Sequence, residues 1–195
     1  SRQIIVEEIG KEGQEKLLKA KVLVVGAGGL GSPVLTYLVG AGVGTIGIVD
    51  FDSIDISNLH RQILYRTPNI GEKKVCAAKK TLSKLNEDVI IYTYPERIDV
   101  DNIREMIQDY DIVVDALDNF SARYLLSDAC YFHKKILVEG AAVSTYGTAT
   151  TIIPNVTPCY RCLYPVSPAD GVTPSCSDIG VLGMIPGVIG CIQAL

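Results

Sequence analysis

The chain has no tryptophan, only three phenylalanines and two histidines, and no uninterrupted run of eighteen apolar residues. Apolar residues nevertheless make up 48% of its 195 positions. The core must therefore consist of valine, isoleucine, leucine and alanine, a composition typical of parallel strands covered by helices on both faces. No segment has the length of a membrane span, and the first residues lack a signal-peptide layout. We expect a cytoplasmic protein without a membrane partner.

The chain also has little excess of one charge over the other. The chain carries 18 lysines and arginines against 22 aspartates and glutamates, a net charge of −4, without a block of either sign. A nucleic-acid-binding surface needs concentrated positive charge. We therefore do not expect nucleic acid as the main partner.

The six cysteines are scattered rather than spaced like those of a small disulfide-linked domain. In a reducing compartment such cysteines are core residues, metal ligands or reactive thiols. Cys76, Cys130 and Cys191 fall within helical patterns and are expected in the core. Cys159 and Cys162 have the C-x-x-C spacing of half a structural zinc site.

Segments with strand periodicity alternate with segments of helical periodicity along the chain. After a short amphipathic helix at 11–19, the expected strands are 22–26, 45–50, 89–94, 112–115, 136–140 and 146–153, and the expected helices are 30–41, 72–85, 100–108 and 120–132. This alternation predicts an α/β fold with a doubly wound, mostly parallel, Rossmann-like sheet. The length favours one domain over 1–195.

Residues 154–178 interrupt the alternation with five prolines among serines and threonines. This composition predicts a flexible crossover loop. Cys176 lies in it, just before a helix expected to begin near Ile179, and a helix N-terminus lowers the pKa of a thiol. The final apolar helix reaches Leu195 without a stop signal, so we expect the domain to be truncated at its C-terminus.

A glycine-rich turn follows the first expected strand. Glycines 26, 28 and 31 match G-x-G-x-x-G, and Asp50 ends the next strand. Such a turn presents backbone N–H groups and a helix N-terminus to phosphate, and the acidic residue accepts hydrogen bonds from ribose hydroxyls. By itself, the motif predicts a dinucleotide-binding domain.

The polar residues after this strand are not those that a dinucleotide requires. Asp52 is followed by Asn58, Arg61 and Gln62 in one short segment, and Lys74 lies near the start of the next expected helix. Arginine and lysine neutralise phosphate oxyanions, while asparagine and glutamine donate neutral hydrogen bonds. This combination favours a nucleoside triphosphate as the ligand.

Asp118 follows the expected strand at 112–115, at the edge where open α/β sheets hold ligands. A carboxylate at this position can hold a Mg²⁺ ion that bridges phosphate oxygens. Alternatively, Asn119 caps the following helix and Asp118 supports that cap. Both interpretations of Asp118 stay open at this point.

Together these residues resemble the ubiquitin-activating-enzyme superfamily, and within it the adenylyltransferases for the sulfur-carrier proteins of molybdopterin and thiamine biosynthesis. The resemblance covers essentially the whole chain, and the segments that carry it are Arg2-Gln3-Ile4, 26–32, Asp50-Phe51-Asp52, 58–62, 71–74, Asp118-Asn119 and Cys159-Tyr160-Arg161-Cys162. It implies ATP-dependent adenylation of the C-terminal glycine carboxylate of a small ubiquitin-like sulfur carrier, giving an acyl adenylate and pyrophosphate.

The resemblance also implies roles for individual residues. The residues expected to contact ATP are Gly26, Gly28, Gly29, Gly31, Asp50, Asp52, Asn58, Arg61, Gln62, Lys74 and Asp118. Among them, Asp50 binds the ribose and Asp118 coordinates Mg²⁺. Because the attacking carboxylate is already ionised at neutral pH, no general base is required, and His60 and His133 are not expected to be catalytic.

Other implied features lie outside the nucleotide contacts. Arg2 matches an arginine that reaches into the neighbouring subunit of the family's homodimers, so we expect a homodimer. Cys176 aligns with a cysteine that, in some relatives, forms a covalent link with the carrier or takes part in sulfur transfer. The family completes a zinc site at Cys159 and Cys162 with a second C-x-x-C that this chain does not contain, so zinc is expected for a full-length protein.

Three alternatives remain. The first is adenylation of another carboxylate, on a modified tRNA nucleoside or a peptide, since such relatives share the ATP site. The second is a nicotinamide-dependent oxidoreductase, although no residue stands out as a hydride-site acid. The third is a catalytically silent partner subunit, which would have no need of the full set Asp50, Arg61, Lys74 and Asp118. The residues do not discriminate between molybdopterin and thiamine pathways.

Overall fold

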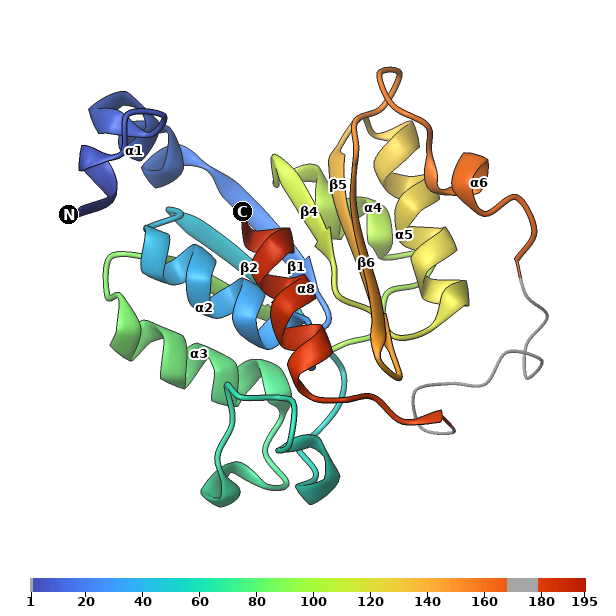
Figure 1. Cartoon of the computed structure of the whole chain (residues 1–195), viewed down its shortest axis with the longest axis horizontal. Coiled ribbons are helices and arrows are strands. Elements are labelled where there is room, and N and C mark those ends of the chain that lie inside the picture. Colours follow the sequence, from blue (N-terminus) through green and yellow to red (C-terminus); the bar gives the residue numbers. More distant parts are fainter. Residues whose placement is uncertain (1, 168–178) are drawn as a thin grey trace.

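A six-stranded sheet in the order β3-β2-β1-β4-β5-β6 forms the centre of the protein (Figure 1). The computed structural model describes residues 2–167 and 179–195. The strands are β1 (Lys21–Val25), β2 (Thr45–Val49), β3 (Ile90–Tyr94), β4 (Ile112–Asp115), β5 (Ile136–Val143) and β6 (Tyr146–Ile152). All neighbouring pairs are parallel except β5 and β6. The predicted doubly wound, mostly parallel sheet is confirmed.

Helices cover the sheet on both faces. Helices α2 (Gly31–Ala41), α3 (Lys74–Leu85) and α8 (Met184–Ala194) pack on one face, and α4 (Ile103–Gln108) and α5 (Phe120–Phe132) on the other. Strand β1 alternates between the two cores: Val22 and Val24 face the first, and Leu23 and Val25 the second. Because both faces of the central strands β1, β2 and β4 are buried, these strands consist mainly of valine, isoleucine and leucine, as the scarcity of aromatic residues indicated.

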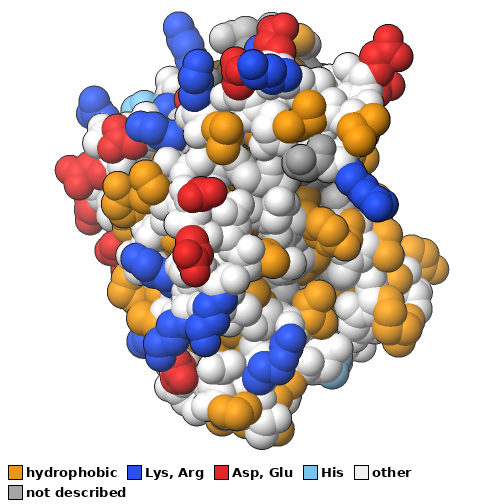
Figure 2. Space-filling view, turned by 90° about the vertical axis from the view of Figure 1, so that its left-hand side faces the viewer, with side chains coloured by type: hydrophobic (Ala, Val, Ile, Leu, Met, Phe, Trp, Pro, Cys, Tyr) orange, Lys and Arg blue, Asp and Glu red, His pale blue; other side chains and the backbone are white. Residues whose placement is uncertain are grey.

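The N-terminal segment consists of the 3₁₀ helix η1 (Arg2–Ile5) and α1 (Gly10–Lys19), which confirms the predicted helical start. The Gln3 and Gln14 amides both donate to the Ala41 carbonyl at the far end of α2. On the face that includes this segment, acidic and basic side chains are scattered among apolar ones (Figure 2). In the described part of the chain, no helix is long and apolar enough to span a membrane.

The connection between β2 and α3 contains two 3₁₀ helices, η2 (Ile56–Asn58) and η3 (Thr67–Asn69). Residues 160–163, expected within a loop, instead form the short helix α6 (Tyr160–Leu163). The buried Tyr160 ring packs edge-on against Tyr124 of α5, with centroids 5.1 Å apart, and this contact anchors the turn. The expected flexible loop is therefore partly helical.

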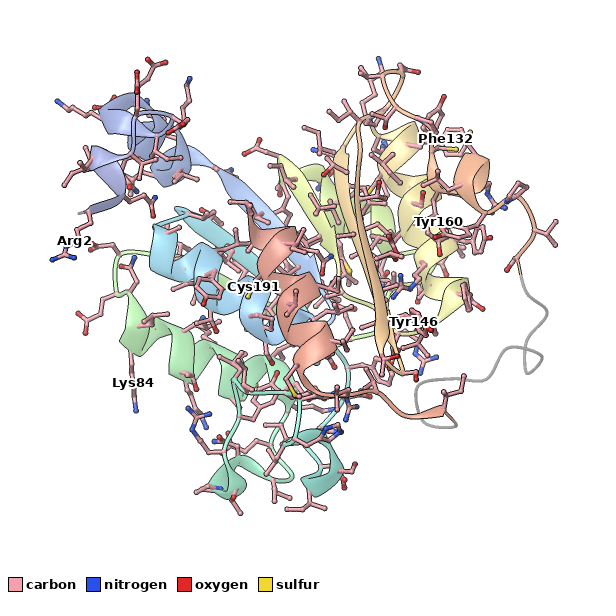
Figure 3. The ribbon with its side chains drawn as sticks, in the orientation of Figure 1. Arg2, Lys84, Phe132, Tyr146, Tyr160 and Cys191 are labelled. Atoms are coloured by element: carbon pink, nitrogen blue, oxygen red, sulfur yellow. The ribbon has the colours of Figure 1, made fainter. Side chains whose placement is uncertain are left out.

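The last helix also differs from its prediction. Helix α8 begins at Met184 rather than near Ile179. The Leu182 N–H donates to the Ser144 carbonyl, 2.9 Å away, and Val181 forms a β-bridge with Ser144, so Val181 and Leu182 lie beside the β5–β6 hairpin instead of in a helix. Cys176 lies outside the described residues. Cys130 is buried as predicted, whereas Cys76 and Cys191 are exposed, so their assignment to the core was wrong. Cys191 lies on α8 (Figure 3).

Candidate active site

A cavity of about 410 Å³ lies at the carboxyl ends of β1, β2 and β4. The strand order reverses between β1 and β4, which is where open α/β sheets bind ligands. Its walls come from the glycine turn after β1, the residues after β2, the start of α3, and the segments that follow β3 and β4. Most of the residues that were expected to contact ATP line this cavity: Gly26, Gly28, Gly29, Asp50, Asp52, Arg61, Gln62, Lys74 and Asp118.

The glycines of the turn have different physical roles. Gly26 adopts φ +103°, and a Cβ there would collide with the Ala116 carbonyl oxygen. A Cβ on Gly31 would collide with the carbonyl oxygen of Gly26, so this glycine permits α2 to pack closely on the turn rather than lining the cavity. Gly28 and Gly29 do line the cavity, which leaves backbone available to a phosphate.

Asp50 is a buried carboxylate with two backbone donors. The Ala27 N–H donates to its Oδ2 (2.8 Å) and the Asp52 N–H to its Oδ1 (2.9 Å). A carboxylate offers about four acceptor positions, so capacity remains for ribose hydroxyls. Burial raises the pKa of Asp50, while the Lys74 charge and the two amides oppose that rise.

Lys74 is a buried cation at the start of α3. Its Nζ donates to the Asp52 carboxylate at 2.8 Å and lies 3.9 Å from the Asp50 Oδ2. Only about 5% of the residue is exposed, and an unpaired ammonium would be costly there. The two carboxylates therefore hold the lysine charge at the cavity wall.

Arg61 and Gln62 bring polar groups from the segment after η2. The Arg61 Nη1 donates to the Ser57 carbonyl (3.1 Å) and lies 2.9 Å from the His60 Nε2. Gln62 is 3% exposed, and its Oε1 has no hydrogen-bond partner among the described residues. A buried amide oxygen without a partner at a cavity wall indicates a position where a ligand or water binds.

Asn58 does not line the cavity. Its Oδ1 accepts from the Asp55 N–H (3.0 Å), and the Asp55 carboxylate in turn caps η2. Asn58 therefore fixes the entry of the segment that carries Arg61. A direct contact between Asn58 and a phosphate stays a prediction.

Asp118 is exposed and lines the cavity directly after β4. Asn119 is the residue that caps α5, because its Oδ1 accepts from the Ala122 N–H at 2.9 Å. The cap that the alternative interpretation placed at Asn119 is therefore present, and the magnesium role of Asp118 stays a prediction. The position of the Asp118 carboxylate at the cavity suits a cation held between phosphate oxygens.

Arg2 and the C-x-x-C cysteines lie away from this cavity. Gln3, next to Arg2, bonds to Ala41 at the end of α2 opposite the glycine turn, about 15 Å along the helix. Figure 3 shows Arg2 at the N-terminal segment. The Cys159 and Cys162 sulfurs are 3.4 Å apart, but no group of three or more potential metal ligands occurs within residues 2–167 and 179–195.

Sequence reasoning missed several residues of the cavity. The Arg97 guanidinium lies 4.2 Å from the centroid of the Phe51 ring, and Arg97, Ile98 and Val100 line the cavity from the segment after β3. Tyr65 donates to the Ala27 carbonyl (2.7 Å) and supports the glycine turn. Only Phe51, adjacent to Asp50, carried a signal in the sequence.

Fold and cavity together define a doubly wound α/β protein whose cavity, at the reversal of strand order, is lined by Arg61, Lys74 and Asp50. The chain belongs to the ThiF family, whose profile matches residues 1–195.

Curated relatives agree with this family. The chain is 48% identical over 198 residues to the sulfur carrier protein adenylyltransferase of Thermus thermophilus, covering 99% of this chain and 73% of the relative. It is 47% identical over 194 residues to the SAMP-activating enzyme E1 of Haloferax volcanii, covering 100% of this chain and 72% of the relative. It is 50% identical over 195 residues to the adenylyltransferase and sulfurtransferase MOCS3 of Culex quinquefasciatus, of which it covers 44%.

Among solved structures, E. coli MccB with MccA-N7isoASN superposes with a TM-score of 0.83 at 25% identity. The match covers 93% of this chain and 56% of that one. The chain thus spans under half of the MOCS3 protein and about three quarters of the two prokaryotic relatives.

Proposed function

We propose that this protein uses ATP to adenylate the C-terminal glycine carboxylate of a small ubiquitin-like sulfur-carrier protein. The main support for the proposal is that one cavity contains a carboxylate suited to bind ribose hydroxyls, Asp50, and two cations suited to bind phosphates, Arg61 and Lys74. Membership of the ThiF family and the names of the relatives support the same reaction. In this proposal, residues 1–195 serve as one adenylation domain.

The chemistry requires positioning and charge rather than proton transfer. A carboxylate oxygen of the carrier attacks the α-phosphorus of ATP, the bond to the α,β-bridging oxygen breaks, and pyrophosphate leaves with the electron pair. Negative charge grows on the leaving group, and Arg61 and Lys74 stabilise it. Asp50 fixes the ribose and so orients the α-phosphorus. The attacking group is already ionised, so His60 and His133 take no part.

The residues at the cavity fit a magnesium nucleotide. Asp118 is exposed at the cavity and is not the helix cap, and Gln62 offers a buried, unsatisfied amide oxygen. When bound, Mg²⁺ neutralises charge between phosphate oxygens, and Asp118 would hold it. Gly26 and Gly31 permit the close packing of the turn, and Gly28 and Gly29 leave its backbone open to the phosphates at the cavity.

Zinc fits only in part. Cys159 and Cys162 are free thiols, Cys159 at the N-cap of α6 and Cys162 within the helix. Burial raises the pKa of Cys159, but hydrogen bonds from Cys162 and backbone amides outweigh it and lower that pKa overall. A structural zinc site needs four ligands, so the other two must come from outside the described residues. We infer that the pair contributes half of such a site. A cytoplasmic location would keep these thiols reduced.

A homodimer with Arg2 acting in trans is part of the proposal. Arg2 is too far from the cavity of its own chain to contact a nucleotide there. Met184, Val188 and Ile192 recur at helical spacing on the exposed side of α8, an apolar surface of the kind that subunit contacts cover. The proposed covalent role of Cys176 concerns a residue outside the described range.

A second candidate substrate is the terminal carboxylate of a peptide. It is favoured by the structural likeness to MccB, which was solved with MccA-N7isoASN. The two candidates share the ATP site and differ only in the carboxylate that accepts AMP.

The nucleotide class is tested by isothermal titration of the protein with ATP–Mg and, separately, with NAD. We expect ATP–Mg to bind and NAD to bind far more weakly. Tight NAD binding without ATP binding would contradict the proposal. Pyrophosphate exchange with a carrier protein and with a free peptide then separates the two candidate carboxylate substrates.

A further inference from the structure

A buried charged cluster lies beneath the cavity, and none of its members was singled out by sequence. Asp115 and Glu139 lie directly opposite one another on the parallel strands β4 and β5. Their side chains share one face of the sheet, and both are at most 2% exposed. Two like charges facing each other across strands are unfavourable, so a cation must compensate them.

Arg123 of α5 supplies that cation, and it also binds a backbone carbonyl. Its Nη1 donates to Glu139 Oε1, and its Nη2 donates to the backbone carbonyl of Leu117. The same residue, Leu117, donates its N–H to Asp115 Oδ1 at 3.0 Å. The peptide unit that joins Leu117 to Asp118 is therefore held by Arg123, and the preceding unit by Asp115.

The opposite face of the sheet is fixed at the same point. The Gln193 Nε2 of α8 donates to the carbonyls of Asp115 (2.7 Å) and Val138 (3.2 Å). A Cβ on Gly140 would overlap the Gln193 side chain, so this glycine makes room for the amide. The end of β4 is thus held on both faces immediately before the cavity.

We propose that Arg123 is a positioning residue for adenylation: through the Leu117 carbonyl it sets the peptide that carries Asp118 into the cavity. This inference rests on the proposed function of Asp118 as a magnesium ligand. Burying a charged cluster is costly, and ion pairs in a core contribute little net stability. We infer that the arrangement orients the Asp118 carboxylate, because the planar guanidinium presents one nitrogen to Glu139 and the other to the Leu117 carbonyl in a fixed geometry.

The test is Arg123→Lys in the full chain. Lysine keeps the charge against Glu139, but its three N–H donors radiate from one nitrogen and cannot reproduce the two separate nitrogens, Nη1 and Nη2, that contact Glu139 and Leu117. In ATP–pyrophosphate exchange we expect kcat to fall at least about tenfold, since small misplacements of site groups cost up to a hundredfold. The Mg²⁺ concentration for half-maximal rate should rise severalfold, with KM for ATP within about twofold.

Arg161→Lys is the matched control. Arg161 also makes a two-bond contact to α5, through Asp128, but it is exposed and lines no part of the cavity. The Arg161→Lys variant should retain the wild-type kcat and the wild-type dependence of the rate on Mg²⁺ concentration. If Arg123→Lys also retains both, the inference is overturned.

Amide hydrogen exchange provides a readout independent of activity. When the Leu117–Asp118 peptide loosens, the adjacent Leu117 N–H should also leave Asp115 Oδ1 more often. Arg123→Lys should therefore lose protection at the Leu117 amide by about tenfold or more, while Val113 and Val114 in β4 keep theirs. Equal loss throughout β4 would mean that Arg123 serves only the stability of the fold, which overturns the inference. If the wild type shows no pyrophosphate exchange with any carrier, the proposed function fails, and hydrogen exchange still decides whether Arg123 sets the Leu117 peptide.

Discussion

Asp118 is the single residue on which the magnesium assignment depends. We predict that Asp118→Asn reduces ATP–pyrophosphate exchange at least about a hundredfold, because an amide oxygen carries no charge to hold the metal. The side chain is exposed and does not cap α5, so the free energy of unfolding should change by less than about 0.5 kcal/mol. Asp88→Asn, a substitution at another exposed aspartate, serves as the control. Exchange at the wild-type rate in Asp118→Asn would remove the assignment.

Glu139 predicts a pH dependence of stability. Burial raises its pKa to about 7, against an ordinary value of 4.5, although Arg123 opposes the rise. The folded state therefore binds this proton more tightly than the unfolded state, and the resulting stability is lost as the pH rises from about 4.5 to about 7. Glutamine does not ionise, so the Glu139→Gln variant should not lose this stability as the pH rises.

The free energy of unfolding, measured by urea titration at several pH values, should thus be similar for wild type and Glu139→Gln near pH 4.5. The difference in favour of Glu139→Gln should grow until about pH 7 and then level off. A difference that does not vary with pH would contradict the buried, proton-binding state of Glu139.

At the scale of elements, the contact between the glycine turn and α2 can be tested with two glycines of the same helix. A Cβ on Gly31 would collide with the Gly26 carbonyl, whereas a Cβ on Gly40 meets nothing within 4 Å. Gly31→Ala should therefore lower the free energy of unfolding by about 1–3 kcal/mol. Gly40→Ala should raise it by about 0.4–1 kcal/mol. Equal effects in thermal or urea unfolding would contradict the close packing described here.

Much of the element pattern could be predicted because it depends on local periodicity. Alternating strands and helices imply parallel strands, and parallel strands bring their carboxyl ends to one edge. The meeting of Asp50, Lys74 and Asp118 at one cavity followed from that geometry alone. The G-x-G-x-x-G turn likewise required the close strand–helix approach that Gly26 and Gly31 permit.

Features that depend on contacts between distant segments could not be predicted. The register that places Asp115 opposite Glu139 is a tertiary property, and Arg123 in sequence resembles any arginine of an exposed helix. The delayed start of α8 depends on Ser144 in a hairpin far away in sequence. Arg97, which lies over Phe51, comes from a segment with no motif.

At the scale of the whole molecule, the proposed role of Arg2 in trans would require two chains for one site. We predict that Arg2→Ala and Asp118→Ala are each inactive or nearly so, and that mixing them restores exchange. In a mixed dimer, the chain carrying Arg2→Ala keeps its own Asp118 and receives Arg2 from its partner, so one of the two sites works. Random mixing should restore about a quarter of the wild-type rate. No recovery after subunit exchange would exclude a role for Arg2 in trans.

The central claim is that this cavity joins a carrier carboxylate to AMP. Its most direct test is ATP–pyrophosphate exchange with a ubiquitin-like sulfur carrier that ends in a free glycine, compared with the same carrier amidated at its C-terminus. We predict magnesium-dependent exchange with the free carboxylate and none with the amide. Equal exchange with both carriers, or none with any carrier tested, would contradict the proposed adenylation.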